Sequence, residues 1–295
     1  MQVVVADQVA VTRQDQGKDR DVRPGGVHRQ MLLHDNADDG LSFKFFRSQY
    51  QPGDKAFTSP RHRHAFQQLR WTESGAINYA PDRYIREGEM AFFPRGAFYG
   101  PQLKDTGTGT LLQFGFDEEH QYGGAWAEVR EKALERLKES GAFEAGVYVD
   151  TDPETGERRE RDSGQALYEE QYELLTGRTF TVPEPGYDEP ILIHPQAFGY
   201  YRADDGVEVK NLGHFFAHPG PNTDVRFQMV RLSGAGSYEL RSERAQIAWT
   251  TGAGLVVDGT TYPAWASVYS KRGEATTLAC AEDIETYVVE FPRRD

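Results

Sequence analysis

The feature of this sequence that most restricts its fold is a repeat between its two halves. Residues 68–72 read QLRWT and residues 246–250 read QIAWT, while residues 94–96 (PRG) match residues 271–273 (KRG). The two matches lie at nearly the same offset along the chain, which chance seldom produces. Self-similarity of this kind predicts two copies of one structural unit in tandem.

Both copies have the pattern of an all-β domain. They contain runs of aromatic and β-branched residues, separated by turn residues at intervals of about 8–12 residues. Between them, apolar residues recur at helical spacing from Trp126 to Leu137, and we expect a second helix over 165–175. We therefore predict an all-β fold with four parts: an N-terminal arm at 1–27, a first barrel at 28–118, a helical bridge at 119–190 and a second barrel at 191–295.

Composition excludes several classes of protein. The chain has 295 residues and a net charge of −13, and an acidic chain is a poor partner for nucleic acid. Its one cysteine, Cys280, allows neither an intramolecular disulfide nor a cysteine-based zinc site, and it suits a reducing cytoplasm. No apolar run approaches the about 20 residues that a membrane span needs, and the N-terminus does not resemble a signal peptide. We therefore expect a cytoplasmic protein with a small-molecule partner.

Two histidines in the first copy, His62 and His64, stand two residues apart. On a β-strand, residues at this spacing point to the same face, so both imidazoles would reach one metal ion. Gln68 has the same parity and would add a carbonyl oxygen, while Gly75 would let the strand turn. The sequence thus predicts a metal site on one wall of the first barrel.

These residues resemble the two motifs of the cupin family, and the repeat makes the chain similar to a bicupin, which has two jelly-roll barrels in tandem. The first cupin motif contains a glycine, two histidines, an acidic or Gln residue and a later glycine, which here are Gly53, His62, His64, Gln68 and Gly75. The second contains a glycine, a Pro-x-Gly turn and a histidine; here they are Gly88, Pro94 and Gly96, with Tyr99 in place of the histidine.

The resemblance implies a divalent transition metal. Cupins that bind metal usually offer three His and one Glu, a set that suits Fe, Mn, Ni, Cu or Zn. Here the corresponding ligands are His62, His64, Gln68 and Tyr99, with iron as the first choice of metal. Tyr99 would ligate the ion or act as an acid or base. Because Gln recurs in the second copy, a structural role for Gln68 stays open.

By the same resemblance, we expect a mononuclear non-haem dioxygenase or related oxidoreductase that acts on a small, aromatic or other organic substrate in the first barrel. Two alternatives stay open: an isomerase or lyase with Tyr99 as acid or base, and a bicupin that binds a small molecule without catalysis. Bicupins often form homodimers. In the second copy, the residues that match the four candidate ligands are Leu240, Ser242, Gln246 and Thr276, so we expect no metal there.

Four arginines, Arg61, Arg63, Arg70 and Arg95, lie near these motifs. They would hold an anionic group of the substrate. The other interpretation is that they are strand charges facing solvent, as the parity of Arg61 and Arg63 suggests.

Overall fold

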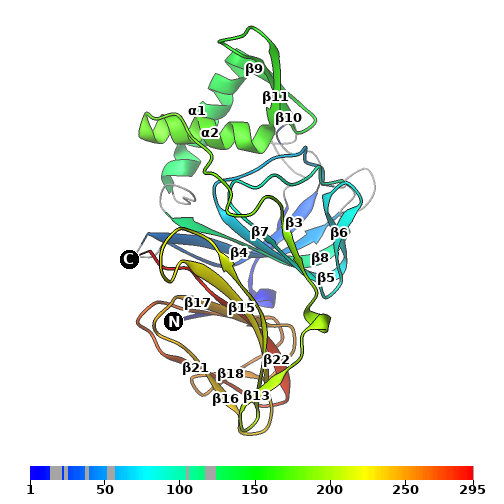
Figure 1. Cartoon of the computed structure of the whole chain (residues 1–295), viewed down its shortest axis with the longest axis vertical. Helices are drawn as coiled ribbons and strands as arrows, with labels where there is room; N and C mark the ends of the chain where they lie inside the picture. Colours follow the sequence, from blue (N-terminus) through cyan, green and yellow to red (C-terminus); the bar gives the residue numbers. More distant parts are fainter. Residues whose placement is uncertain are drawn as a thin grey trace. The chain divides into compact units, whose positions relative to one another are not determined.

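The computed structural model describes residues 1–13, 22, 26–36, 40–51, 57–103, 106–116 and 124–294. The chain divides into two compact units (Figure 1). We call residues 11–29 and 40–192 the first unit, and residues 1–10, 30–39 and 193–295 the second unit. Each contains one of the two barrels predicted from the repeat. The expected position of Gly53 lies outside the described residues.

The first unit is built around one antiparallel sheet with the order β12-β7-β5-β8-β4-β3-β2, and with β6 paired to β5. The strands of this sheet are β2 (Thr12–Arg13), β3 (Val27–Asn36), β4 (Leu41–Tyr50), β5 (Gln67–Ala80), β6 (Arg83–Arg86), β7 (Met90–Phe93), β8 (Thr106–Phe116) and β12 (Ile191–Ile193). Residues 30–36 of β3 and Ile193 of β12 are assigned to the second unit. Strands β4 and β8 pair along their whole length, from Leu41 opposite Phe116 to Tyr50 opposite Gly107. The aromatic run predicted as a strand at residues 41–50 is therefore confirmed as β4.

Strand β5 differs from the expectation at Gly75. We expected the chain to turn there, but β5 continues to Ala80. Gly75 has a φ of +78°, and a Cβ on it would lie 2.7 Å from the backbone oxygen of Thr106. The register with β8 shifts between Thr72 and Ser74. The glycine therefore permits a bulge-like irregularity inside one long strand, at a position where a side chain would not fit.

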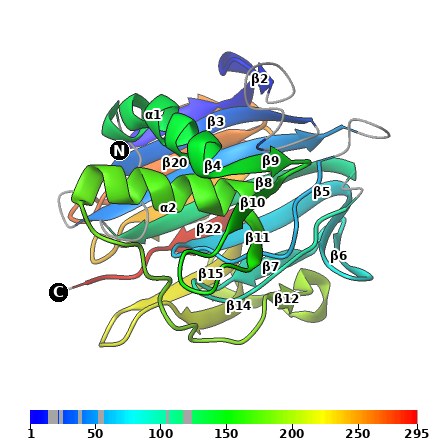
Figure 2. The same cartoon turned by 90° about the horizontal axis from the view of Figure 1, so that it is seen from above.

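The predicted bridge contains two helices and a small sheet. Its elements are α1 (Gly124–Ser140), β9 (Gly141–Glu144), β10 (Val147–Thr151), β11 (Arg158–Asp162) and α2 (Ser163–Thr176). The helices lie side by side and share a small apolar core (Figure 2). Asp162 begins α2, because its side chain accepts a hydrogen bond of 2.8 Å from the backbone nitrogen of Gln165. Among the described residues, no helix is both long enough and apolar enough to cross a membrane.

The second unit has a sheet with the order β1-β20-β17-β22-β15-β14-β13 and a smaller one with the order β16-β21-β18-β19. Its strands are β1 (Gln2–Val5), β13 (Tyr201–Asp204), β14 (Val207–Phe216), β15 (Asp224–Leu232), β16 (Ser237–Leu240), β17 (Gln246–Thr250), β18 (Leu255–Val257), β19 (Thr260–Tyr262), β20 (Ala266–Ser270), β21 (Thr276–Cys280) and β22 (Ile284–Glu290). Short 3-10 turns occupy Ala6–Gln8 and Pro195–Ala197.

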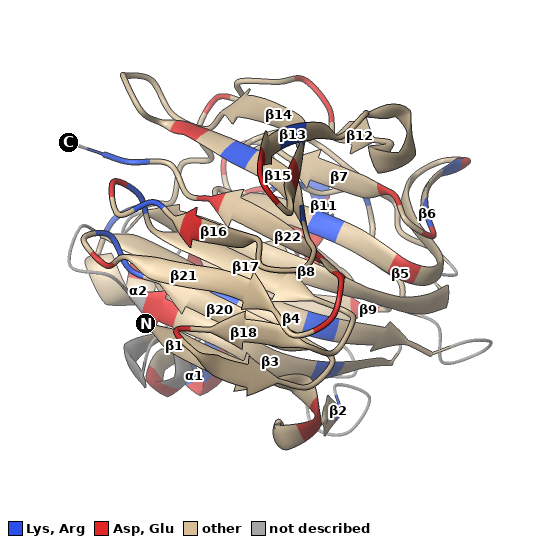
Figure 3. Cartoon of the chain, turned by 90° about the horizontal axis from the view of Figure 1, so that it is seen from below, with Lys and Arg blue, Asp and Glu red and all other residues tan. Residues whose placement is uncertain are grey.

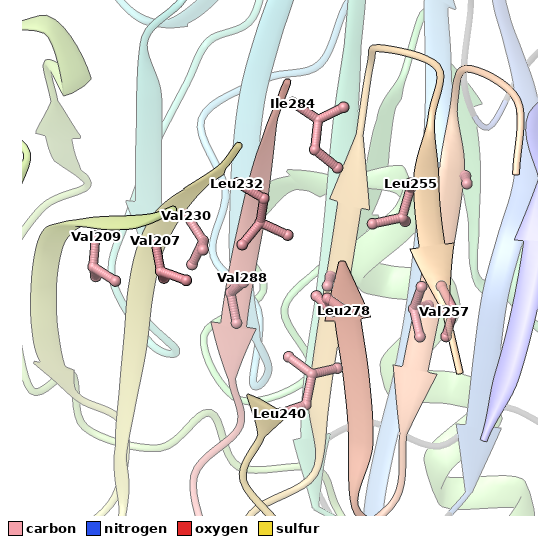
Figure 4. Packing of buried hydrophobic residues seen from close by; sticks show 13 residues of the cluster. Val207, Val209, Val230, Leu232, Leu240, Leu255, Val257, Leu278, Ile284 and Val288 are labelled. Atoms are coloured by element: carbon pink, nitrogen blue, oxygen red, sulfur yellow. The ribbon is translucent and has the colours of Figure 1, made fainter. Parts of the chain in front are cut away.

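The interior of the second unit is filled by aliphatic side chains. Strands β17, β18, β20 and β21 carry no charged residue, and Figure 3 shows many of the unit's charged residues at turns. Figure 4 shows valines, leucines and an isoleucine from several strands packed together. Leu240, which occupies the sequence position matching His62, is fully buried in this cluster. The second barrel therefore has an apolar core where the first has polar side chains.

The N-terminal segment is not an arm separate from both barrels. Strand β1 pairs with β20 through four residues of each strand, so residues 1–10 belong to the second unit. Strand β2 pairs instead with β3. The expected limits of the arm at 1–27 and of the first barrel from 28 therefore differ from those of the structure. A short strand gives no sequence signal of its distant partner.

The backbone register supports the internal repeat. In the first unit His62 pairs with Tyr99 in an antiparallel bridge, and in the second unit Leu240 pairs with Thr276. These are the pairs that the sequence match places at equivalent positions. Likewise, the nitrogen of Gly96 donates to the oxygen of His64 at 2.8 Å, and Gly273 donates to Ser242 at 2.8 Å. The same hydrogen bonds thus recur in both copies.

Candidate functional site

A cavity of about 280 Å³ lies in the first unit. It is lined by all four candidate ligands of the sequence analysis: His62, His64, Gln68 and Tyr99. Its other walls include residues of β3, β4 and β8, and Asp162, Gly164, Gln165, Tyr168 and Phe180 of the bridge region. The bridge therefore covers part of the site.

His62 is buried and has hydrogen-bond partners on both ring nitrogens. Its Nδ1 lies 2.8 Å from the backbone oxygen of Pro60, an atom that only accepts, so Nδ1 carries the proton. Nε2 therefore has the free lone pair, and it accepts a hydrogen bond of 2.7 Å from the hydroxyl of Tyr99. The buried carboxylate of Asp162 lies 3.9 Å from Nδ1. These contacts fix the neutral tautomer with Nε2 directed to Tyr99.

His64 has the same tautomer but leaves its second nitrogen unoccupied. Its Nδ1 donates to the backbone oxygen of Phe66 at 2.7 Å, and its ring stacks on that of Phe66 with centroids 3.9 Å apart. Its Nε2 is buried and has no hydrogen-bond partner in the described part of the chain. Burial, followed by the neighbouring basic groups of His62 and Arg70, lowers the pKa of His64 to about 3. His64 is therefore a neutral imidazole with an unused lone pair.

The segment that carries the two histidines is not a strand, although the prediction placed it on one. Regular structure begins only at Gln67, and His62 is held by its isolated bridge to Tyr99. The turn that follows β7 holds the backbone of His64 in place. The backbone nitrogen of Gly96, a residue with a φ of +75°, donates a hydrogen bond to the backbone oxygen of His64. Both imidazoles nevertheless line the same cavity.

Gln68 does not offer its oxygen freely to the cavity. Its Oε1 accepts a hydrogen bond of 2.8 Å from Nε of Arg70. This contact fits the open structural interpretation of Gln68, and its role as a metal ligand stays a prediction. Sequence reasoning could not detect this, because the hydrogen bond depends on side-chain directions at the start of β5.

Arg70 is almost fully buried, with a fractional exposure of 5%. Its Nη2 donates to the hydroxyl of Tyr99 at 3.4 Å and to Oε1 of Gln102 at 3.3 Å. Its guanidinium carbon lies 4.5 Å from the ring centroid of Phe93. Its Nη1 is buried without a hydrogen-bond partner in the part of the chain that the structure describes. The positive charge of Arg70 would stabilise negative charge on Tyr99.

The other predicted arginines are less central. Arg63 lines the cavity, whereas Arg61 is exposed and Arg95 is not among the lining residues. The guanidinium carbons of Arg61 and Arg63 lie 4.3 and 4.8 Å from the ring centroid of Phe98. Solvent-facing charge, the second of the two interpretations, therefore suits Arg61.

Sequence reasoning missed Asp162, Gln102 and Arg29 as lining residues. Asp162 stands just before a predicted helix, and that position signals an N-cap rather than a site. Gln102 and Arg29 belong to no motif. Their place at the cavity follows from the tertiary fold alone.

Three side chains that line the cavity carry atoms of the kind that bind metal ions: the two imidazoles and the phenol of Tyr99. Metal-binding histidines usually donate one ring N–H to a carbonyl and present the other nitrogen to the ion, as both histidines are arranged to do here. Tyr99 adds an oxygen beside Nε2 of His62. No group of three or more His, Cys, Asp or Glu side chains is placed to hold a metal among the described residues. A metal in this cavity would therefore need a donor of another kind beside the histidines, and the hydroxyl of Tyr99 lies 2.7 Å from Nε2 of His62.

No protein-family model and no curated protein matches this sequence. Solved structures do match its fold. A candidate dioxygenase from Nostoc punctiforme has a TM-score of 0.58 and 10% identity, covering 99% of this chain and 82% of its own. A point mutant of Bacillus subtilis oxalate decarboxylase has a TM-score of 0.54 and 10% identity, with coverage of 100% and 78%. Streptomyces albus HEPD, with 2-hydroxyethylphosphonate and Fe(II) bound, has a TM-score of 0.53 and 11% identity, with coverage of 99% and 76%.

Proposed function

Because this chain has the bicupin fold, we propose that it is an enzyme that holds a divalent transition metal in its first barrel and acts on a small organic molecule. The proposed donors are Nε2 of His62, Nε2 of His64 and the hydroxyl oxygen of Tyr99. The second barrel has an aliphatic interior and a structural role in this proposal.

One observation carries the proposal, namely the unpartnered Nε2 of His64. A buried polar atom without a hydrogen bond costs about 1–3 kcal/mol. Folded proteins rarely tolerate this cost without a reason. A metal ion accepts the lone pair of a neutral imidazole directly and would remove the penalty. Because Nδ1 of the same ring is held by Phe66, the ring is already oriented for this role.

The other residues of the cavity would support the donors and shield the site from water. When bound, the ion would supply Lewis acidity and, in the case of iron, redox chemistry. Tyr99 would give up its proton to become a phenolate donor, and Arg70, 3.4 Å from its oxygen, would stabilise the charge. The bridge residues Tyr168 and Phe180 would limit the access of water.

At the finer level, the proposed reaction is that of a mononuclear non-haem dioxygenase or related oxidoreductase, with iron as the metal. The support is analogy with similar folds, since one similar structure is described as a candidate dioxygenase and another contains Fe(II). Another study of the oxalate decarboxylase concerns its Mn(II) centres, so manganese is the next choice. The fold itself does not determine the reaction.

A second function has an observation of its own. The hydroxyl of Tyr99 donates to Nε2 of His62 at 2.7 Å and accepts from Arg70. In this arrangement His62 would take the phenolic proton, and Tyr99 would then remove a proton from a substrate. This is the chemistry of an isomerase or lyase, and it does not require all three groups to bind metal.

Metal analysis separates the two functions. The purified protein, the His64→Ala variant and a control variant at the exposed His194 would be measured for metal per chain by mass spectrometry. The first function predicts about one divalent ion in the wild type and in His194→Ala, and little in His64→Ala. Trace metal in the wild type, or equal metal in all three proteins, would reject it in favour of the second.

A further inference from the structure

Arg70 has no anionic partner among the described residues, although it is buried. The partners of its Nε and Nη2 are the neutral side chains of Gln68, Gln102 and Tyr99. Its Nη1 has none in the described chain. A buried charge without a counter-charge is costly, and in proteins such charges are normally paired. Here the cost is explained if a negative charge arrives with a ligand.

The charges around the cavity point the same way. Three arginines line it, Arg29, Arg63 and Arg70, while Asp162 is the one carboxylate among its described lining residues. Asp162 is already engaged, because it caps helix α2 through Gln165 and lies 3.9 Å from Nδ1 of His62. The cavity therefore has an excess of positive charge in a chain whose net charge is −13. Such local focusing of one sign favours a ligand of the other sign.

Six of the described lining residues are phenylalanines or tyrosines, and the cavity is small. Its volume of about 280 Å³ is at the low end for ligand sites, which span about 300–1,000 Å³. Flat apolar walls favour a flat apolar ligand body through stacking and edge-to-face contacts. The aromatic lining residues are Tyr50, Phe57, Phe66, Tyr99, Tyr168 and Phe180.

From these observations we propose that the substrate is a small aromatic carboxylate and that Nη1 of Arg70 binds one of its carboxylate oxygens. The inference rests on the proposed function only in placing the substrate in this cavity. Because Nε and Nη2 are occupied, the guanidinium would contact the ligand through Nη1 alone rather than as a two-nitrogen fork. Gln68 and Gln102 keep the guanidinium in place.

The test compares two probes of nearly equal shape, benzoate and benzamide, which differ in charge. Both would be titrated by ligand-observed NMR into metal-free wild-type protein, so that a metal cannot bind the carboxylate. The wild type is expected to bind benzoate at least tenfold more tightly than benzamide. Arg70→Gln should remove this preference while leaving benzamide affinity within about twofold, and Arg61→Gln, on an exposed side chain outside this cavity, should retain it.

Equal affinity of the wild type for the two probes would overturn the inference without any variant, so misfolding of Arg70→Gln cannot hide the answer. A benzoate preference that survives in a folded Arg70→Gln protein would overturn it as well. Metal content is measured separately. If the purified protein contains no metal but prefers benzoate to benzamide, the proposed function is contradicted and this inference is supported. If the purified protein contains metal but shows no preference for benzoate, the proposed function is supported and this inference is overturned.

Discussion

The hydroxyl of Tyr99 lies 2.7 Å from Nε2 of His62, and two backbone hydrogen bonds of 2.9 Å join the same two residues. The side-chain contact is therefore fixed by the backbone pairing beneath it. In the second unit the same backbone pairing holds Leu240 opposite Thr276. One scaffold thus supports a polar site in one barrel and a packed core in the other, and the difference lies in the side chains.

Replacement of Tyr99 by phenylalanine should weaken metal binding. The change removes one of three proposed donors and leaves the ring in place, so we expect at least about a tenfold loss of affinity. Isothermal titration of the metal-free variant with Mn²⁺ measures the effect. Unchanged affinity, with loss of turnover, would instead make Tyr99 a proton-transfer group.

Replacement of Gln68 by leucine should leave metal binding unchanged. Its oxygen accepts from Arg70, so the variant loses the support of the guanidinium rather than a metal ligand. We expect wild-type metal content together with about threefold to tenfold weaker benzoate binding, in line with the loss of a hydrogen bond to a charged group. Loss of the metal would restore Gln68 to the ligand set.

Shortening the side chain of Leu240 should destabilise the second barrel, because it would leave a cavity in the core. This side chain is fully buried among aliphatic neighbours. Leu240→Ala should lower the free energy of unfolding by about 2–5 kcal/mol, measured by urea denaturation. The control Leu103→Ala alters a side chain that is 48% exposed, and it should change stability by less than about 0.5 kcal/mol. A small effect at Leu240 would mean that the second core is not packed as described.

The acid stability of the second unit should depend on Asp224. Burial raises the pKa of this carboxyl, but hydrogen bonds from Arg226 and Arg244 outweigh it and lower the pKa to about 2. Because its pKa is lower in the folded state, this carboxylate stabilises the fold at pH values above the pKa that it has in the unfolded chain. That stabilisation is lost as the pH falls through about 2. The contribution is about 1 kcal/mol, because the carboxylate is partly exposed.

Unfolding of the wild type and of Asp224→Asn would be followed by urea denaturation at several values between about pH 5 and pH 2. The variant should be less stable at the upper end of this range, and the difference should shrink toward the lower end. A constant difference across the range would show that the carboxylate charge is not its source.

Much of the architecture could be predicted because it is recorded in local patterns. The repeated QLRWT and QIAWT segments are β5 and β17, and the aromatic run at 41–50 is β4. The pairing of β1 with β20 could not be predicted, because four residues of strand carry no information about a partner more than two hundred residues away. The irregularity at Gly75 could not be predicted either, because a glycine after a strand pattern is equally typical of a turn.

The candidate site was predictable in its members but not in its contacts. His62 and His64 were named from their spacing and Tyr99 from the resemblance to the second cupin motif, and all three line one cavity. The bond between Gln68 and Arg70, and the approach of Asp162 from the bridge, depend on how side chains turn after the fold has formed. Motifs identify which residues gather at a site, whereas their hydrogen bonds decide which of them are free to act.

The central claim, a metal held by His62, His64 and Tyr99, is tested most directly by titrating metal-free protein with Co²⁺ and following the visible absorption of the ion. We predict a saturating signal at one equivalent for the wild type and for His194→Ala, and none at that stoichiometry for His64→Ala. The absence of a saturating signal in the wild type, or an unchanged signal in His64→Ala, would contradict the claim.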